Sequence, residues 1–287
     1  MNSGVLALFY KLKPFLPRSS QILLRRLRAK KILKNLTPPY LLDSVVTENP
    51  FPIPDGFNCV VLLTHDVETE KGLDLIESIR KIERKEEVPS TWNFVLDKYG
   101  THPDTIKSLN DEGCECGAHG LTHDGKLFQN ETVYKERMNR NLERSEKLNL
   151  QGFRSPALHR NTEWMQTLPF KWDSSFPAWD PFQPQPGGCE HYAPYKLNNK
   201  TWEFPVTLFQ DFTLFYELQE KNIDIWIAQA NALAKRKELI NIIVHPDYIT
   251  DELLVMYQAF IRYCKENLNP WFTTPSKLCD WLDESNA

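Results

Sequence analysis

Several features that would quickly assign a chain to a class are missing here. The six cysteines include no Cys-x-x-Cys pair, which argues against a zinc ribbon and against a dense disulfide framework. We therefore expect reduced thiols and a cytoplasmic protein. No stretch approaches the roughly 20 apolar residues that span a bilayer. The apolar run near the start is followed rather than preceded by positive charges, and no small-residue cleavage site comes after it, so no secretory signal is predicted.

Acidic residues are missing from residues 1–37, which carry nine Lys and Arg residues. The net charge of −4 therefore becomes −13 for the remainder, with 25 basic and 38 acidic residues. Residues 18–36 fit an imperfect amphipathic helix. Two interpretations stay open: attachment to the inner face of an anionic membrane, where each Lys or Arg contributes roughly 1 kcal/mol, or a solvated leader. This stretch has no aromatic residue to stack on bases, so no nucleic-acid partner is expected. The leucines on one side of the helix are Leu23, Leu24, Leu27 and Leu36.

After this basic leader, the chain divides into a proline-rich connection over residues 38–56 and a single domain over residues 57–287. Apolar, β-branched runs alternate in this domain with segments of helical periodicity, as in parallel βαβ units. We therefore predict an α/β fold. Strands are expected near residues 59–65, 88–96, 152–156, 170–175, 201–206, 240–245 and 270–274, with another before His119. Helices are expected near residues 73–85, 103–113, 131–148, 217–237, 251–267 and 275–283.

Ionisable side chains stand at the ends of five predicted strands. The carboxyl ends of parallel strands meet at one edge of a sheet or barrel, where α/β folds place their chemistry. Packing alone gives little reason for such residues at five separate strand ends. We therefore expect one site, built from Asp66, Glu68, His119, His123, Arg154, Asp173 and His245.

His119 and His123 stand four residues apart in a chain with only seven histidines. Histidine is the commonest metal-binding side chain. The pair alone would also suit a helix face or a turn, but the carboxylates at other strand ends favour a metal site. Two imidazoles and one carboxylate leave coordination positions open, as a catalytic site requires. Zinc is the expected metal, and manganese, cobalt and nickel accept the same donors.

In order and approximate spacing, these residues resemble the motifs of the NodB-homology polysaccharide deacetylases. The resemblance implies a distorted (β/α)7-type barrel of mainly parallel strands. It also implies a metal-dependent hydrolase that removes an N-acetyl group from a sugar in a polysaccharide, oligosaccharide or glycolipid precursor. The matching segments are Thr64-His65-Asp66-Val67-Glu68 for Thr-Phe-Asp-Asp, His119 and His123 for His-x-x-x-His, Arg154-Ser155-Pro156 for Arg-x-Pro-x-Gly, Asp173-Ser174-Ser175 for an Asp-centred strand end, and His245 for the last motif.

The resemblance further implies a role for each residue. Asp66 would be the general base, with Arg154 paired to it. His245 would be the general acid, oriented by Asp173, which would raise its pKa. Asp66 also stays open as the acidic metal ligand in place of Glu68. The metal ligands would be Glu68, His119 and His123.

Two positions depart from the family motifs. Val67 stands where the family has a second aspartate, and the third motif has Ala157-Leu158 where a glycine is expected.

Two other functions remain as alternatives: a hydrolase of cyclic amides on the same scaffold, and a carbohydrate-binding relative that has lost catalysis. The region 172–205, rich in aromatic residues and proline, is expected to contact sugar rings, the alternative being a loop that packs on the barrel. His159, His191 and Asp247 are interpreted as surface loop residues that could reach a substrate.

Overall fold

The structure, a computed structural model, describes residues 18–42, 51–98 and 103–285. The apolar run near the start of the chain lies outside the described residues, as does part of the predicted connection, residues 43–50. The domain boundaries expected at residues 37 and 56 stay predictions.

A central strand, β1 (Cys59–Val67), organises the sheet, and all nine of its residues are buried. Its run of valines and leucines suits a strand that is covered on both faces. β8 (Leu239–Ile243) pairs with one side of β1. On the other side, β9 (Pro270–Thr273) pairs with the start of β1 and β2 (Thr91–Phe94) with its end. All three pairings are parallel, so β1 delivers Asp66 to an edge where neighbouring strands also end.

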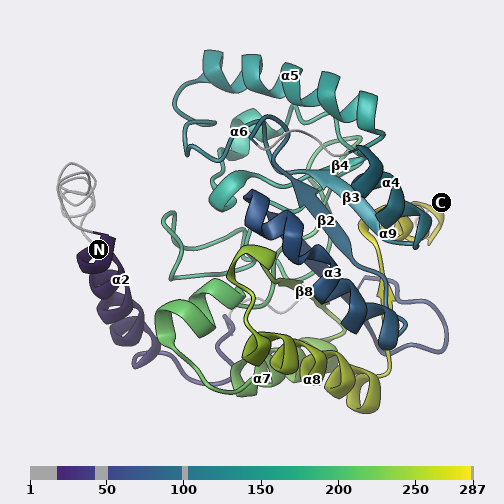
Figure 1. The fold of residues 1–287 in the computed structure, drawn as a ribbon. Helices are drawn as coiled ribbons and strands as arrows, with labels where there is room; N and C mark the ends of the chain where they lie inside the picture. The colour runs from purple at the N-terminus through teal and green to yellow at the C-terminus, as the bar shows by residue number, and fades with distance from the viewer. Residues whose placement is uncertain (1–17, 43–50, 99–102, 286–287) are drawn as a thin grey trace.

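The sheet continues from β2 in the order β3, β4, β5, β7 and β6, and only the last pairing is antiparallel. The segment that follows β7 returns to β8. The Thr207 amide donates to the Asn241 carbonyl oxygen, and the Asn241 amide donates to Thr207 Oγ1. The result is a curled half-barrel (Figure 1), which confirms the predicted distorted barrel of mainly parallel strands. These strands are β3 (Glu115–Ala118), β4 (Gly152–Phe153), β5 (Trp172–Asp173), β6 (Tyr195–Lys196) and β7 (Trp202–Glu203).

Helices flank the sheet at the positions that the apolar periodicity predicts. The Asn130 side chain caps α5 by accepting a hydrogen bond from the Val133 amide. The helix expected from residue 217 begins instead at Asp224, because residues 212–218 form a π-helical segment, η3 (Phe212–Leu218). The flanking helices are α3 (Glu70–Lys85), α4 (Pro103–Asp111), α5 (Glu131–Leu148), α6 (Thr162–Met165), α7 (Asp224–Arg236), α8 (Asp251–Leu268) and α9 (Pro275–Ser285), with 3-10 turns η2 (Pro156–Leu158) and η4 (Pro246–Tyr248).

The basic segment forms the predicted helix, α2 (Arg18–Leu33). It lies at the side of the molecule opposite α9 (Figure 1) and packs on η3. Ala29 is buried in this contact, and the Arg26 and Arg28 guanidinium groups donate to the carbonyl oxygens of Tyr216 and Phe182. Among the described helices, none combines the length and hydrophobicity that crossing a bilayer demands.

The aromatic region 172–205 packs inward. Phe176, Phe182 and Tyr192 are each less than 5% exposed, and Trp172 is fully buried between β4 and β7. Side chains this inaccessible do not offer a ring face to a sugar. The expectation that they contact a substrate is therefore wrong, and the alternative of a loop that packs on the barrel holds for them.

Candidate active site

The end of β1 presents two carboxylates on one face. Successive side chains of a strand point to opposite faces, so Asp66 and Glu68 lie on the same side while Val67 between them enters the core. The Asp247 carboxylate accepts a hydrogen bond from the Glu68 backbone amide at 2.9 Å and another from Thr69 Oγ1. Asp247, which was interpreted as a loop residue, thus fixes the turn that carries Glu68.

Three side chains bring ligand atoms together beside Asp66. The ligand atoms of Glu68, His119 and His123 all lie within 4.8 Å of one another, and His123 Nε2 lies 3.0 Å from Glu68 Oε1. Donors around a tetrahedral zinc ion are about 3.3 Å apart, given bond lengths of about 2.0–2.2 Å. Glu68, His119 and His123 could therefore hold a metal ion, and their assignment as the ligands stays a prediction.

The two histidines are prepared to act as ligands. His119 Nδ1 lies 3.0 Å from the Arg154 carbonyl oxygen, and because a carbonyl only accepts, Nδ1 carries the proton. This leaves the lone pair on His119 Nε2. His119 Nε2 is buried without a hydrogen-bond partner among the described residues, whereas His123 Nε2 faces the Glu68 carboxylate at 3.0 Å. An orphaned buried acceptor is costly, and a cation at the cluster would satisfy it.

The pKa values of His119 and Glu68 agree with this role, whereas Glu68 outweighs burial and raises the pKa of His123. Burial is the largest influence on His119 and lowers its pKa to about 4, so its ring is neutral at neutral pH. Burial alone would raise the pKa of Glu68, but His123 and the charge of His245 lower it to about 2. A neutral imidazole and an ionised carboxylate are the forms that bind metals.

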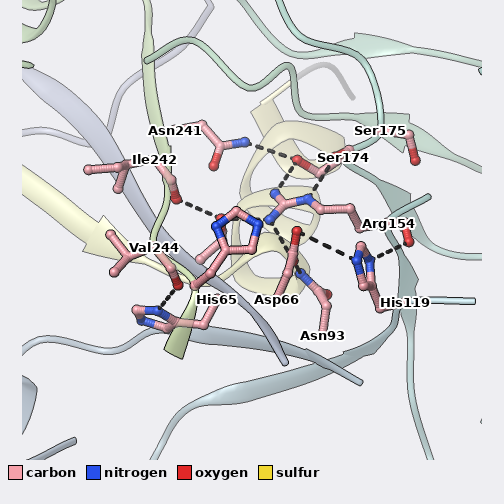
Figure 2. Close-up of polar contacts among 12 residues, drawn as sticks. His65, Asp66, Asn93, His119, Arg154, Ser174, Ser175, Asn241, Ile242 and Val244 are labelled. Atoms are coloured by element: carbon pink, nitrogen blue, oxygen red, sulfur yellow. Dashed lines mark hydrogen bonds and ion pairs between the residues drawn. The ribbon is translucent and has the colours of Figure 1, made fainter. Parts of the chain in front are cut away.

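Asp66 lies against the cluster with one oxygen held and one directed at it. Asp66 Oδ1 accepts hydrogen bonds from Asn93 Nδ2 at 2.9 Å and from Arg154 Nη1 at 3.2 Å. Asp66 Oδ2 lies 3.9 Å from His119 Nε2 (Figure 2). Burial would raise the pKa of Asp66, but Arg154 and His119 hold it well below its usual range. Asp66 is therefore ionised at neutral pH.

Arg154 is itself fixed by β5. Its Nε donates to the Ser174 carbonyl at 2.8 Å, and its Nη2 to Ser174 Oγ at 2.7 Å. Asn241 on β8 also donates to Ser174 Oγ, at 3.0 Å (Figure 2). Arg154 is fully buried. Its guanidinium thus links β4, β5 and β1 and holds the Asp66 carboxylate, as the sequence predicts.

His245 approaches the cluster from the end of β8, which pairs with β1. Its Nδ1 lies 2.6 Å from Asp211 Oδ1, its backbone amide donates to Asp211 Oδ2 at 2.7 Å, and its Nε2 lies 4.0 Å from Glu68 Oε1. Burial would lower the pKa of His245, but the charge and hydrogen bond of Asp211 outweigh it and raise the pKa to about 10. His245 therefore carries a proton on Nε2 at neutral pH.

The predicted contact between Asp173 and His245 is wrong. Asp173 is fully buried at the end of β5, accepts a hydrogen bond from Ser175 Oγ at 2.6 Å, and lies opposite Glu203 in the β5–β7 register. Burial raises the pKa of both acids, and the charge of Asp173 raises that of Glu203 further. Asp173 and Glu203 form a buried acid pair that joins two short strands, whereas Asp211 orients His245.

Three residues of the site were not assigned from the sequence. Asn93 lies on β2, and its register partner on β1 is Asp66. Only the pairing of the two strands identifies it as a site residue. Asp211 directly follows the run VTLFQ, and an acidic residue at the end of an apolar run is the one signal that it offers. Asp247 stands two residues after His245, in the 3-10 turn η4 that follows β8.

The histidine of β1, His65, supports the site from the other face. His65 Nδ1 lies 2.8 Å from the Val244 carbonyl oxygen (Figure 2), and its Nε2 lies 2.7 Å from Glu83 Oε1 on α3. Tyr257 on α8 donates to the same Glu83 oxygen at 2.7 Å. His65 neighbours Asp66, and Val244 neighbours His245. The contact therefore fixes the strand ends of the candidate base and acid relative to each other.

Comparisons with known proteins agree with this geometry. The family model described as polysaccharide deacetylase matches residues 58–166. No protein in the curated set matches the chain.

Solved structures share the fold at low sequence identity. A Mycobacterium smegmatis protein assigned as a polysaccharide deacetylase is 19% identical, with a TM-score of 0.64, over 88% of this chain and 96% of that one. Puue allantoinase is 17% identical, with a TM-score of 0.66, over 85% and 97%. The Bacillus subtilis peptidoglycan deacetylase PdaC is 13% identical, with a TM-score of 0.51, over 82% and 95%.

The family match covers three of the sequence elements on which the resemblance was based. Residues 58–166 include the Asp66 and Glu68 strand end, the histidine pair and Arg154. His245 and its partner Asp211 lie beyond the match and join the site through the fold. Residues 58–166 of this chain thus match the model of the polysaccharide deacetylase family.

Proposed function

We propose that the chain is a metal-dependent hydrolase that removes the acetyl group from an N-acetylated sugar in a polysaccharide, oligosaccharide or glycolipid precursor. The main support is the cluster of Glu68, His119 and His123, whose ligand atoms lie within 4.8 Å with an ionised carboxylate on one side and a protonated imidazole on the other. Amide hydrolysis needs this combination, because water must lose a proton and the departing amine must gain one.

Glu68, His119 and His123 would hold the cation, and zinc is the first choice for two imidazoles and one carboxylate. A divalent cation there would polarise the acetamide carbonyl and lower the pKa of water at the site, which a base as weak as Asp66 requires. The orphaned Nε2 atom of His119 supports this assignment.

The side chains of this chain would carry the protons. Asp66 Oδ2 accepts a proton from water while Asn93 and Arg154 hold Oδ1. Water adds to the acetyl carbon, the C–N bond breaks, and His245 Nε2 gives its proton to the amine nitrogen. Asp211 keeps Nδ1 engaged, so that the mobile proton of His245 is the one on Nε2. Acetate and the free amino sugar leave.

The test is acetate release from a panel of acetylated chito-oligosaccharides, acetylated sugar phosphates and lipid-linked sugars. Protein stripped with a chelator should be inactive and should recover with zinc or another divalent cation. His119→Ala should lose both metal and turnover, whereas His191→Gln, at an exposed histidine outside the site, should lose neither. Release of ring-opened product from cyclic ureides, with no acetate from any sugar, would support the cyclic-amide alternative instead.

The outer face of α2 supports a further element of the proposal, contact with an anionic membrane surface. Leu23, Leu24 and Leu27 are 57%, 46% and 58% exposed. Lys30 and Lys31 continue the same face at spacings of three, four and seven residues. A helix with leucines and lysines turned away from its own domain has the composition of an interfacial helix.

Sedimentation with lipid vesicles tests this contact. The protein should bind vesicles that contain phosphatidylserine and should bind pure phosphatidylcholine less. Leu23→Glu combined with Leu27→Glu should abolish binding, whereas Val255→Glu, at an equally exposed apolar residue on α8, should not. If the double variant instead dissolves a dimer and the native protein ignores vesicles, the leucines cover a second copy of the chain.

A further inference from the structure

A cavity beside the metal cluster has no role in the chemistry above. Its volume is about 620 Å³, and it lies between the loop that follows His123 and the loop that follows Arg154. We call it the basic pocket. His159 lines it too, and burial, joined by the nearby charge of His123, lowers the pKa of His159. The side chains that matter here are Lys126, Gln129, His159, Arg160, Asn161 and Gln185.

The charge of the basic pocket is one-sided. Lys126 and Arg160 line it, and no aspartate or glutamate does. Neither side chain takes part in any ion pair among the described residues. The acid nearest in sequence, Asp124, is already bound by both terminal nitrogens of Arg137, at 2.7 and 2.9 Å. Another cavity, beside η3 and α8, differs in kind, because Asp211 and two glutamates line it with one lysine and several aromatic rings.

The Arg160 guanidinium is held in place by carbonyl oxygens, and the acids whose charges reach it, Asp180 and Glu203, form no ion pair with it among the described residues. Its Nη1 donates to the Leu158 carbonyl oxygen at 3.1 Å, and both Nη atoms lie 3.3 Å from the Gln185 carbonyl oxygen. The Gln185 side chain also holds the Arg160 backbone. The Arg160 amide donates to Gln185 Oε1 at 3.0 Å, and Gln185 Nε2 donates to the Arg160 carbonyl oxygen at 3.2 Å. Carbonyl oxygens orient an arginine but carry no net charge. The remaining N–H donors of Arg160 are thus available for an anion.

The loop that carries Arg160 has an unfavourable backbone. Ala157 and Leu158 have φ angles of 55° and 50°, a region that L residues other than glycine seldom occupy. These are the residues that stand where the family motif has glycine. Such a turn persists only when its surroundings enforce it, and it is typically found at functional sites. Here it turns the chain from Pro156, beside the metal cluster, to His159 and Arg160 in the basic pocket.

We propose that the basic pocket binds an anionic group, a phosphate or a carboxylate, carried by the same substrate whose acetamide is cleaved at the metal cluster. The proposal rests on the proposed deacetylase function and narrows it, because the preferred substrates become acidic or phosphorylated N-acetylated sugars rather than neutral glycans. Arg160 supplies a planar pair of donors suited to either oxyanion, Lys126 adds a mobile charge, and Asn161 and Gln129 offer neutral donors.

Kinetics on matched substrates test the proposal. Turnover of N-acetylglucosamine 1-phosphate, of an N-acetylated oligosaccharide containing uronic acid, and of neutral chito-oligosaccharides would be compared for the native protein and for Arg160→Gln. A charge-assisted contact is worth enough to change kcat/KM by about 10- to 100-fold. Arg160→Gln should lose that factor on the anionic substrate that fits, mainly through KM, and less than about threefold on neutral ones. The preferred substrate distinguishes phosphate from carboxylate.

Control variants separate binding from folding. Lys135→Gln on α5, whose ammonium pairs with Glu131 in solvent, should change neither class of substrate. Arg160→Lys, which keeps the charge but loses the fork, should recover part of the anionic activity, and thermal melting should show that each variant folds. Equal losses on neutral and anionic substrates for Arg160→Gln, or a native preference for neutral sugars, would overturn the proposal.

A binding measurement keeps this inference separate from the deacetylase assignment. Inorganic phosphate titrated into the native protein should shift the backbone amide NMR signals of residues 126 and 158–161, and Arg160→Gln should abolish the shifts. Phosphate binding there without any acetate release would leave the anion site standing and remove the proposed reaction. Acetate release without phosphate binding, and without an anionic preference, would do the reverse.

Discussion

Replacing Asp66 by asparagine is expected to reduce kcat by about 10²- to 10⁴-fold, the usual contribution of a general base, with the bound metal retained. The amide side chain keeps an oxygen for Asn93 and Arg154 but cannot accept a proton at the second position. Glu68→Gln should behave differently and lose the metal, because Glu68 contributes the carboxylate of the ligand cluster. Metal content by elemental analysis and turnover on one acetylated substrate are the two measurements.

Folding needs a control in this experiment, because Asp66 is buried beside Arg154. Removing one partner of a buried ion pair costs about 3–5 kcal/mol, although Thr64 and Ser174 also hold Arg154 here. Thermal melting of Asp66→Asn should therefore show a folded protein of lower stability. If Asp66→Asn loses metal while Glu68→Gln keeps it, the two carboxylates exchange roles.

Loss of the proton on His245 is the second change with a large expected effect. His245→Gln should lower kcat by about 10²- to 10⁴-fold on an N-acetyl sugar. It should have far less effect on an aryl acetate, because a phenolate leaves without being protonated. The comparison of the two leaving groups separates an acid from a residue that merely shapes the site. An equal loss on both substrates would contradict the assignment.

The pH profile of Asp211→Asn tests the partner of His245. Because Asp211 raises the pKa of His245, the acid form persists at neutral pH and is lost only as the pH rises through that raised value. Without the Asp211 charge, the pKa of His245 should fall, and the alkaline limb of kcat/KM should move to lower pH. Asp173→Asn should leave that limb in place. The opposite result would restore Asp173 as the orienting acid.

Most of the metal cluster can be predicted from the sequence, because its residues lie close to the ends of recognisable strands. Asp66 and Glu68 follow an apolar run that can only be a buried strand, and period-two alternation puts them on one face. His119 and His123 come from one loop, so their spacing alone predicts that they meet. Arg154 stands at the end of a predicted strand, where packing gives little reason for a charged side chain. Its position therefore indicates a functional residue.

The orienting acid could not be recovered in the same way. Asp173 and Asp211 both follow apolar segments, and sequence offers no measure of which one faces a strand 34 or more residues later. The fold decides, because β5 turns Asp173 inward against Glu203 while the segment after Val206 runs beside β8. The π-helical turn that follows Asp211 also has no periodicity that a sequence pattern would detect. The sequence does not predict the partners of side chains that meet only when the sheet closes.

The same limit applies to the helix at the start of the described chain. Its leucines and basic residues predict an amphipathic helix, which the structure contains as α2. The pattern does not tell which face meets the domain. Packing on η3 uses Ala29 and the arginine side chains, and this leaves Leu23 and Leu27 outside.

Diffraction from crystals grown with zinc, recorded on both sides of the zinc absorption edge, tests the central claim most directly. The account predicts one anomalous peak bonded to His119 Nε2, His123 Nε2 and a Glu68 oxygen at about 2.0–2.2 Å, with Asp66 outside the bonded set and His245 Nε2 facing the open side. A peak bonded to Asp66 instead of Glu68, or no peak at the histidine pair in a protein that releases acetate, would contradict it.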